Sequence, residues 1–288
     1  MKAIRILPFL VITVLFPAAA QDSGTQPSQT AGQTAQLTSA QQQAIDELNE
    51  AARYYREGNF SEAQQHAEKA LALNPLSEAA PLFIARTIQA QYKPGDRNET
   101  NLSKAREAID AYKRILVRDP KHEEAYRAVA YLYAALKEDE LLRQWVFQRA
   151  VDPSFSAEKR AEAFVVLASK EWDCAFKITE LPANMATSLL ERGAMKIHYT
   201  KPNDPAEFEK AQQCAANGLN LIESAIGLDS DDEAAWSYKT NLLMELSKLA
   251  EMDNNLLLKS EFEKQADAAR NTLFEFVNRK SNNRSAKP

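Results

Sequence analysis

Residues able to do chemistry are few in this 288-residue chain, and their spacing does not bring them together. The three histidines, His66, His122 and His198, fall in separate segments. His122 precedes two glutamates but lacks the second histidine of a zinc-protease helix, so an ordinary acidic helix start explains it better. The acidic run 229–233 lacks the glycine and the final glutamate of a calcium loop, and it is typical of helix capping. We therefore expect no catalytic residue, no metal and no cofactor.

The two cysteines, Cys174 and Cys214, are the pair for which we do predict chemistry. They fall on two long expected helices, 157–177 and 205–228, which should pack antiparallel. In an oxidising compartment the two thiols would form a disulfide. The alternative is two buried thiols on facing helices, which would behave as small apolar residues.

The composition favours helices and shows no marked charge bias. Hydrophobic residues make up 45% and charged residues 26%, with only 7 glycines, which is a poor basis for turn-rich β architectures. The formal charge of −5 comes without a clustered basic face, which argues against a nucleic-acid partner.

The first twenty residues are typical of a secretory leader. A positively charged start precedes an apolar run, 6–16, that is too short to span a membrane. Small residues follow, so we expect cleavage between Ala20 and Gln21; the alternative is an uncleaved anchor. The mature protein should then reside in the periplasm or outside the cell, without stable membrane insertion. Residues 21–40 are polar and lack aromatic side chains, and we expect them to form a flexible linker.

Segment 44–77 has the pattern of two amphipathic helices joined by a tight turn. Gly58 and Phe60 mark the turn, and Pro75 ends the second helix. Small residues at helix-spaced positions let the two helices approach closely; they are Ala51, Ala63 and Ala70. Two such helices within about 34 residues, with a glycine turn and a closing proline, resemble a tetratricopeptide repeat.

The resemblance covers residues 44 to about 280 and, together with the leader, is closest in kind to exported bacterial tetratricopeptide repeat (TPR) proteins. It implies an all-α fold, a right-handed superhelical stack of antiparallel helix pairs with about four to five units. We expect repeats 1–3 in 41–153, degenerate repeats 4–5 in 154–280, and a disordered tail in 281–288.

Three places depart from the repeat pattern. Between helices expected at 78–92 and 103–118, the loop 93–103 is longer than the usual turn and is either disordered or functional. In the third unit Leu142 stands where a small residue is usual. Residues 183–197 are expected to form a short extra helix.

The resemblance also implies a binding groove lined by the first helix of each of the first three units. Its positions on this chain are Tyr55, Arg56, Leu82, Arg86, Gln89, Glu124, Arg127 and Tyr131. Arginine and tyrosine tend to dominate binding surfaces, so the groove should prefer an extended acidic and aromatic segment. The alternative is that these side chains are solvated, with the arginines paired to glutamates such as Glu57 and Glu124.

These features favour a scaffold that binds another protein or peptide segment in the groove. The alternative is a structural subunit of a cell-envelope assembly that packs through its convex face and irregular C-terminal half. We disfavour an enzyme because no group of residues supports catalysis.

Overall fold

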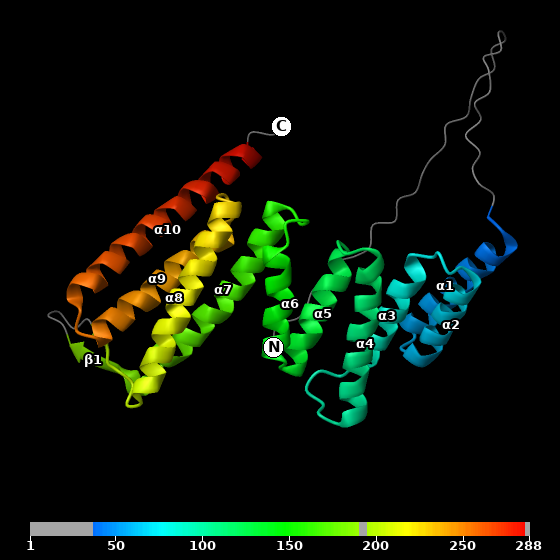
Figure 1. The fold of residues 1–288 in the computed structure, drawn as a ribbon, viewed down its shortest axis with the longest axis horizontal. Coiled ribbons are helices and arrows are strands. Elements are labelled where there is room, and N and C mark those ends of the chain that lie inside the picture. The colour runs from blue at the N-terminus through cyan, green and yellow to red at the C-terminus, as the bar shows by residue number, and fades with distance from the viewer. Residues whose placement is uncertain (1–36, 190–194, 286–288) are drawn as a thin grey trace, which may run out of the picture. The chain divides into compact units, whose positions relative to one another are not determined.

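The computed structural model describes residues 37–189 and 195–285. The chain divides into two units, Met1–Thr38 and Ser39–Pro288, and every described helix lies in the second unit (Figure 1). The leader and its cleavage site at Ala20–Gln21 lie outside the described residues, as does the linker up to residue 36. The helices are α1 (Ser39–Arg56), α2 (Phe60–Leu73), α3 (Ala79–Gln91), α4 (Glu99–Arg118), α5 (Glu123–Leu136), α6 (Asp139–Val151), α7 (Ala157–Thr179), α8 (Pro205–Leu228), α9 (Glu233–Met252) and α10 (Leu256–Ser285).

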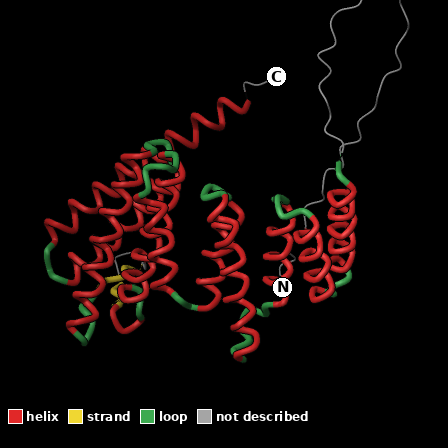
Figure 2. Tube along the Cα trace, turned by 45° about the vertical axis from the view of Figure 1, so that its right-hand side comes forward, coloured by secondary structure: helices red, strands yellow, loops and turns green. Residues whose placement is uncertain are grey.

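Consecutive helices pack against each other along the second unit, which makes five helix pairs from α1–α2 to α9–α10. Most of the described residues are helical, and the two short strands are a small addition (Figure 2). The all-α prediction with four to five units is therefore confirmed. Among the described helices, none has a stretch that is both long and apolar enough to cross a membrane.

Alanines allow the close approach of the first helices. Ala51, Ala63, Ala67 and Ala70 are completely buried where α1 and α2 meet. Gly58 has φ +81° in the connecting turn, a conformation that costs glycine little. The small residues of the repeat pattern are therefore buried where the pattern predicts that the two helices pack closely.

The connection between α3 and α4 is shorter than the expected loop 93–103. Helix α4 begins at Glu99, because the side chain of Asn98 accepts a hydrogen bond from the backbone N–H of Asn101. The Asn101 side chain is itself buried; its Oδ1 accepts from Lys93 N at 2.7 Å, and its Nδ2 donates to Lys93 O and Asp96 O. The loop is thus an ordered turn pinned by one amide.

The helix expected at 183–197 is wrong, because the segment forms a β-hairpin after a short 3₁₀ turn at Pro182–Asn184. Strands β1 (Met185–Leu189) and β2 (Met195–Tyr199) pair antiparallel, from Met185↔Tyr199 to Leu189↔Met195. The short runs carry β-branched and aromatic residues, which favour strands. Asn184 fixes the base of the hairpin, since its side-chain Nδ2 donates to Ile178 O and its backbone carbonyl accepts from Thr200 N.

The last two helix pairs are longer than the first three. Helices α7 and α8 span 23 and 24 residues, and Gly218 lets them meet α9, since an added Cβ there would lie 2.5 Å from Leu242 Cδ2. Helix α10 continues through 281–285, which we expected to belong to a disordered tail, and residues 286–288 lie outside the described part.

Candidate functional site

The predicted groove residues come from α1, α3 and α5, the first helices of three successive pairs. The structure joins two of these helices through Arg86 of α3 and Glu124 of α5. The guanidinium donates from Nε to Oε1 and from Nη2 to Oε2, both at 2.5 Å. This hydrogen bonding lowers the pKa of the Glu124 carboxyl from its usual value. Because both side chains are exposed, the pair orients the two groups more than it stabilises the fold.

Aromatic side chains continue the same face toward α1. Tyr55 lies edge-on to Phe60 and to Phe83, with ring centroids 5.2 and 5.8 Å apart. In α3, the Oε1 atom of Gln89 accepts a 2.6 Å hydrogen bond from the hydroxyl of Tyr112. Burial raises the pKa of that hydroxyl, so it remains a donor, and the Gln89 amide keeps one orientation.

The other predicted groove residues make fewer contacts. Arg56 and Tyr131 are exposed, and Leu82 is half-buried against the core of the first three pairs. Arg127 has its Nε 3.8 Å from a Glu123 oxygen, which is a weak contact for an ion pair. The face therefore combines an internally satisfied centre, Arg86 with Glu124, and an exposed periphery.

Behind this face lies a buried arginine that sequence reasoning missed. Arg149 of α6 is only 4% exposed, and its guanidinium forms an ion pair with both carboxylate oxygens of Glu123. It also lies over the rings of Tyr126 and Phe155, at 3.7 and 4.7 Å. Burial raises the pKa of the Tyr126 hydroxyl to about 12. The cluster joins α5 to α6, and the only sequence signal for it was an arginine two residues before the end of α6.

Cys174 of α7 and Cys214 of α8 lie at bonding distance. Their Sγ atoms are 2.04 Å apart and their Cα atoms 6.0 Å apart, as a disulfide requires. Their bond joins α7 and α8, which are the longest described helices apart from α10. The predicted antiparallel partnership of these helices is what brings the cysteines together.

A polar network holds the β-hairpin to α7 and α9. The buried carboxylate of Glu245 accepts from Thr179 Oγ1 at 2.5 Å and from Lys248 Nζ at 2.7 Å. Lys248 also reaches Glu180, which accepts from the Tyr199 hydroxyl. Burial alone would raise the pKa of Glu180. The hydrogen bond and the positive charge of Lys248 outweigh that effect, so the pKa of Glu180 lies below its usual value.

Ser188, His198 and Glu251 form a second link between the hairpin and α9. Ser188 Oγ lies 2.8 Å from His198 Nε2, and His198 Nδ1 lies 3.2 Å from Glu251 Oε1. The order of groups is that of an acyl-transfer relay. Lys259 neutralises Glu251 at 2.6 Å, however, and with His198 it keeps the pKa of Glu251 low against the opposing effect of burial. We assign the relay to anchoring the hairpin.

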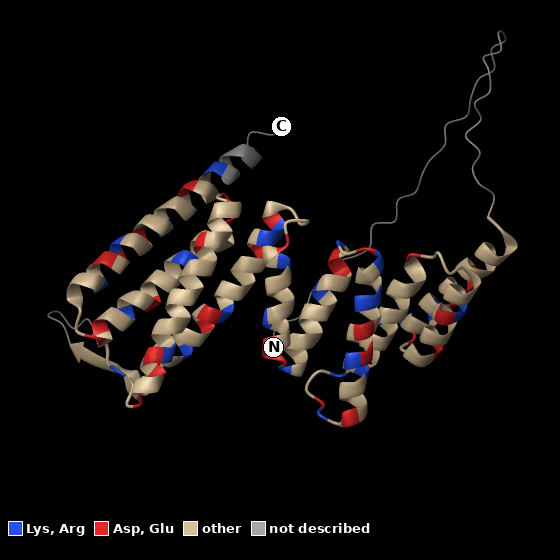
Figure 3. Cartoon of the chain, in the orientation of Figure 1, with Lys and Arg blue, Asp and Glu red and all other residues tan. Residues whose placement is uncertain are grey.

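Charges elsewhere are mixed. Lysines and arginines alternate with acidic residues along the helices (Figure 3). Within the described residues, no group of three or more histidine, cysteine, aspartate and glutamate side chains is arranged to hold a metal ion.

The stacked helix pairs define a tetratricopeptide-like helical repeat protein. No protein-family model matches the chain, and no curated protein matches it. Among solved structures, it is similar to MamA 41-end from Desulfovibrio magneticus RS-1, at 12% identity and TM-score 0.39, over 85% of this chain and 98% of that one. It is also similar to PilF of Pseudomonas aeruginosa, at 12% identity and TM-score 0.36, over 85% and 100%.

A third similar structure is YrrB, described as a TPR protein with an unusual peptide-binding site. The identity is 12% and the TM-score 0.35, over 77% of this chain and 92% of that one. The stacked helix pairs themselves establish the repeat fold.

Proposed function

We propose that the chain is an exported, non-catalytic scaffold that holds an extended segment of a partner protein against the face formed by α1, α3 and α5. The proposal is supported by contacts that link the three first helices: Arg86 of α3 donates to Glu124 of α5, and Tyr55 of α1 packs against Phe83 of α3. Gln89 of α3 accepts from the Tyr112 hydroxyl. Side chains fixed by their own hydrogen bonds lose little freedom on binding, which favours recognition.

The expected preference for acidic segments depends on the two exposed arginines of the face, Arg56 and Arg127. Arg86 is already paired with Glu124, as the alternative interpretation of the groove anticipated. Arg56 and Arg127 remain as exposed cations beside the exposed rings of Tyr55 and Tyr131. An acidic and aromatic segment would meet both, and its binding should weaken as salt screens the charges.

The test compares arginine substitutions on and off the face. A crosslinking pull-down from the native envelope supplies the partner. Arg56→Ala with Arg127→Ala should weaken its binding and reduce the salt dependence, and adding Arg86→Ala should weaken it further. A matched control, Arg106→Ala with Arg118→Ala, removes two arginines of α4 and should bind normally. Undiminished binding by a folded triple variant would refute the groove.

Export is tested separately. The leader pattern supports cleavage after Ala20, so protein recovered from the exporting cell should begin at Gln21. Intact mass decides the matter, and a mass that retains residues 1–20 would contradict export by this route. The alternative role, a structural subunit of an envelope assembly, is supported by exposed apolar side chains near the end of α10, where Phe274 is 58% and Val277 43% exposed.

A further inference from the structure

The two cysteines of the disulfide differ in how far they are exposed. Cys214 is 9% exposed and belongs to a buried cluster that includes Phe208, Ala211 and Ala215. Cys174 packs at the edge of the same cluster and is only partly buried. The bond therefore has one covered end, at Cys214, and one partly exposed end, at Cys174.

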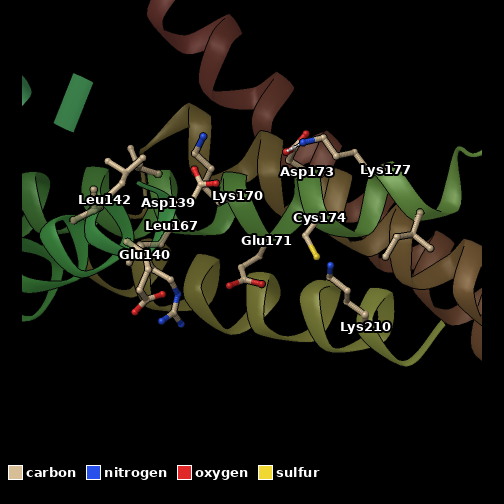
Figure 4. A pocket seen from close by; sticks show the side chains of 14 residues that line it. Asp139, Glu140, Leu142, Leu167, Lys170, Glu171, Asp173, Cys174, Lys177 and Lys210 are labelled. Carbon is tan, nitrogen blue, oxygen red and sulfur yellow. Dashed lines mark hydrogen bonds and ion pairs between the residues drawn. The ribbon is translucent and has the colours of Figure 1, made fainter. Parts of the chain in front are cut away.

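The exposed side of Cys174 borders a cavity of about 650 Å³ between α6, α7 and α8. Cys174 is one of the residues that line this cavity, whereas Cys214 is not. In Figure 4, Glu171 and Cys174 of α7 point toward α8, and Lys210 points back from that helix. The volume is in the range of sites that admit small molecules. A small solute can therefore reach Cys174 while the two helices stay packed.

Thiol–disulfide exchange depends on access and on the leaving group. An external thiolate attacks one sulfur and forms a new S–S bond to it, while the other sulfur leaves as a thiolate. The step is faster when the leaving thiol has a lower pKa. Two features of the structure thus matter: which sulfur can be reached, and what stabilises the sulfur that leaves.

Lys210 lies where it can stabilise a thiolate at Cys214. The two residues are four positions apart on α8, so their side chains are neighbours on one side of that helix. Lys210 is exposed, and it takes part in none of the ion pairs that the described residues form. A neighbouring ammonium group lowers the pKa of a thiol and so favours its departure as a thiolate.

The charges beside Cys174 on its own helix offset each other. Lys170 and Glu171 precede Cys174 by about one turn and have opposite charges. Asp173 and Lys177 form an ion pair with each other. The two ends of the disulfide are therefore distinguished by access and by the position of Lys210, not by the field along α7.

We propose that the Cys174–Cys214 disulfide is a thiol-exchange site of the folded protein, opened by a small thiol at Sγ of Cys174. The incoming thiolate forms an S–S bond to Cys174, and the bond to Cys214 breaks. The electron pair of that bond stays on Cys214 Sγ, which takes a proton from water. Cys174 then carries the small thiol as a mixed disulfide. A second thiolate attacks the sulfur of the bound thiol, which releases a small disulfide and leaves Cys174 as a thiolate that water protonates.

The exchange changes the covalent link between α7 and α8 and leaves their other contacts in place. Ala211 and Ala215 are completely buried in the cluster around Cys214, and the reaction does not involve them. No residue of the α1–α3–α5 face takes part, so the proposal stands independently of the groove.

The test treats the oxidised, folded protein with glutathione and traps the products with N-ethylmaleimide at early times. Trypsin cuts after Lys170, Lys177 and Lys210, so unreduced digests place each cysteine in its own peptide for mass spectrometry. The first product should carry glutathione on Cys174 and maleimide on Cys214. Equal or larger amounts of glutathione on Cys214 would overturn the proposal.

The rate of opening shows whether the folded protein reacts. The rate should rise in proportion to the glutathione concentration and change little when urea is added below the unfolding transition. A rate that rises steeply with urea, or that does not depend on glutathione, would mean that the bond opens only through unfolding, and this too would overturn the proposal.

The role of Lys210 is tested with Lys210→Gln against Lys264→Gln, a control on α10 that removes an exposed lysine outside the cavity lining. Both variants should keep the helix content of the wild type by circular dichroism. This comparison uses 2-mercaptoethanol, which has no carboxylate for Lys210 to attract. Lys210→Gln should slow the opening roughly threefold, because about one unit of thiol pKa changes exchange rates by about that factor. The control should react as the wild type does, and equal rates for all three proteins would contradict the role of Lys210.

Discussion

Replacing the buried arginine behind the candidate face should cost far more stability than replacing its exposed neighbour. Arg149 and Arg127 approach the same carboxylate, Glu123, but Arg149 is 4% exposed and Arg127 is 69% exposed. Removing one partner of a buried pair typically costs about 3–5 kcal/mol. Glu123 is 37% exposed and can be resolvated, which places Arg149→Met at the low end of that range.

Two further terms nearly cancel. The substitution loses the contacts of the guanidinium with the rings of Tyr126 and Phe155, worth roughly 0.5–2 kcal/mol each. It also removes Nε of Arg149, a buried donor without a partner, whose desolvation costs about 1–3 kcal/mol. The net expectation for Arg149→Met is therefore a loss of about 3 kcal/mol.

Urea unfolding followed by circular dichroism measures the difference, with Arg127→Met as the matched control. The control should lie within about 0.5 kcal/mol of the wild type. A double-mutant cycle with Glu123→Gln should give a coupling energy of about 1 kcal/mol or more for Arg149. Equal effects of the two arginine substitutions would refute the reasoning.

Three other outcomes follow from the described contacts. Alkylation of the unreduced, denatured protein should label neither Cys174 nor Cys214; reduction should remove about 4 kcal/mol by the loop-entropy estimate for a separation of 40 residues, and labelling of both thiols would contradict the bond. Asn101→Ala should speed proteolysis and amide exchange in the 92–98 turn and cost about 1–3 kcal/mol, whereas unchanged exchange would show that the amide is not what pins the turn. The pKa values of Glu180 and Glu251 are lowered in the folded state, so both carboxylates stabilise the fold fully above the ordinary carboxyl pKa of about 4.3. This stabilisation is lost as the pH falls through the lowered pKa values. The melting temperature of a variant with Glu180→Gln and Glu251→Gln should therefore depend less on acid pH than that of the wild type.

Helix pairing was predictable wherever a short-range pattern sets it. Small residues at 51, 63 and 70, with the glycine turn at 58, reported the α1–α2 contact directly. The start of α4 was misplaced because one buried amide, Asn101, decides where the loop ends, and an isolated asparagine carries no such signal. The hairpin was missed because its five-residue strands depend on anchoring contacts from α7 and α9, which are distant in sequence.

For the candidate site, the sequence left open whether the arginines are free or paired with glutamates. The pattern placed Arg86 and Glu124 on one face, and the structure shows that they neutralise each other. The cavity between α6, α7 and α8 could not be predicted, because side chains of three helices that are separate in sequence line it. Arg149 was missed since burial of a charge depends on three-dimensional partners.

The Cys174–Cys214 bond has a mechanical consequence for a protein that is tethered at both ends. With the bond formed, a pulling force passes through the two sulfurs and bypasses the chain between them. Unfolding under load would then release roughly 140 Å less contour length than the same chain reduced, since the sequence separation is 40 and each step from residue to residue spans at most about 3.6 Å. The β-hairpin lies inside that covalent loop, so tension on the termini never reaches it. In a force-extension trace only the reduced chain would show this added length.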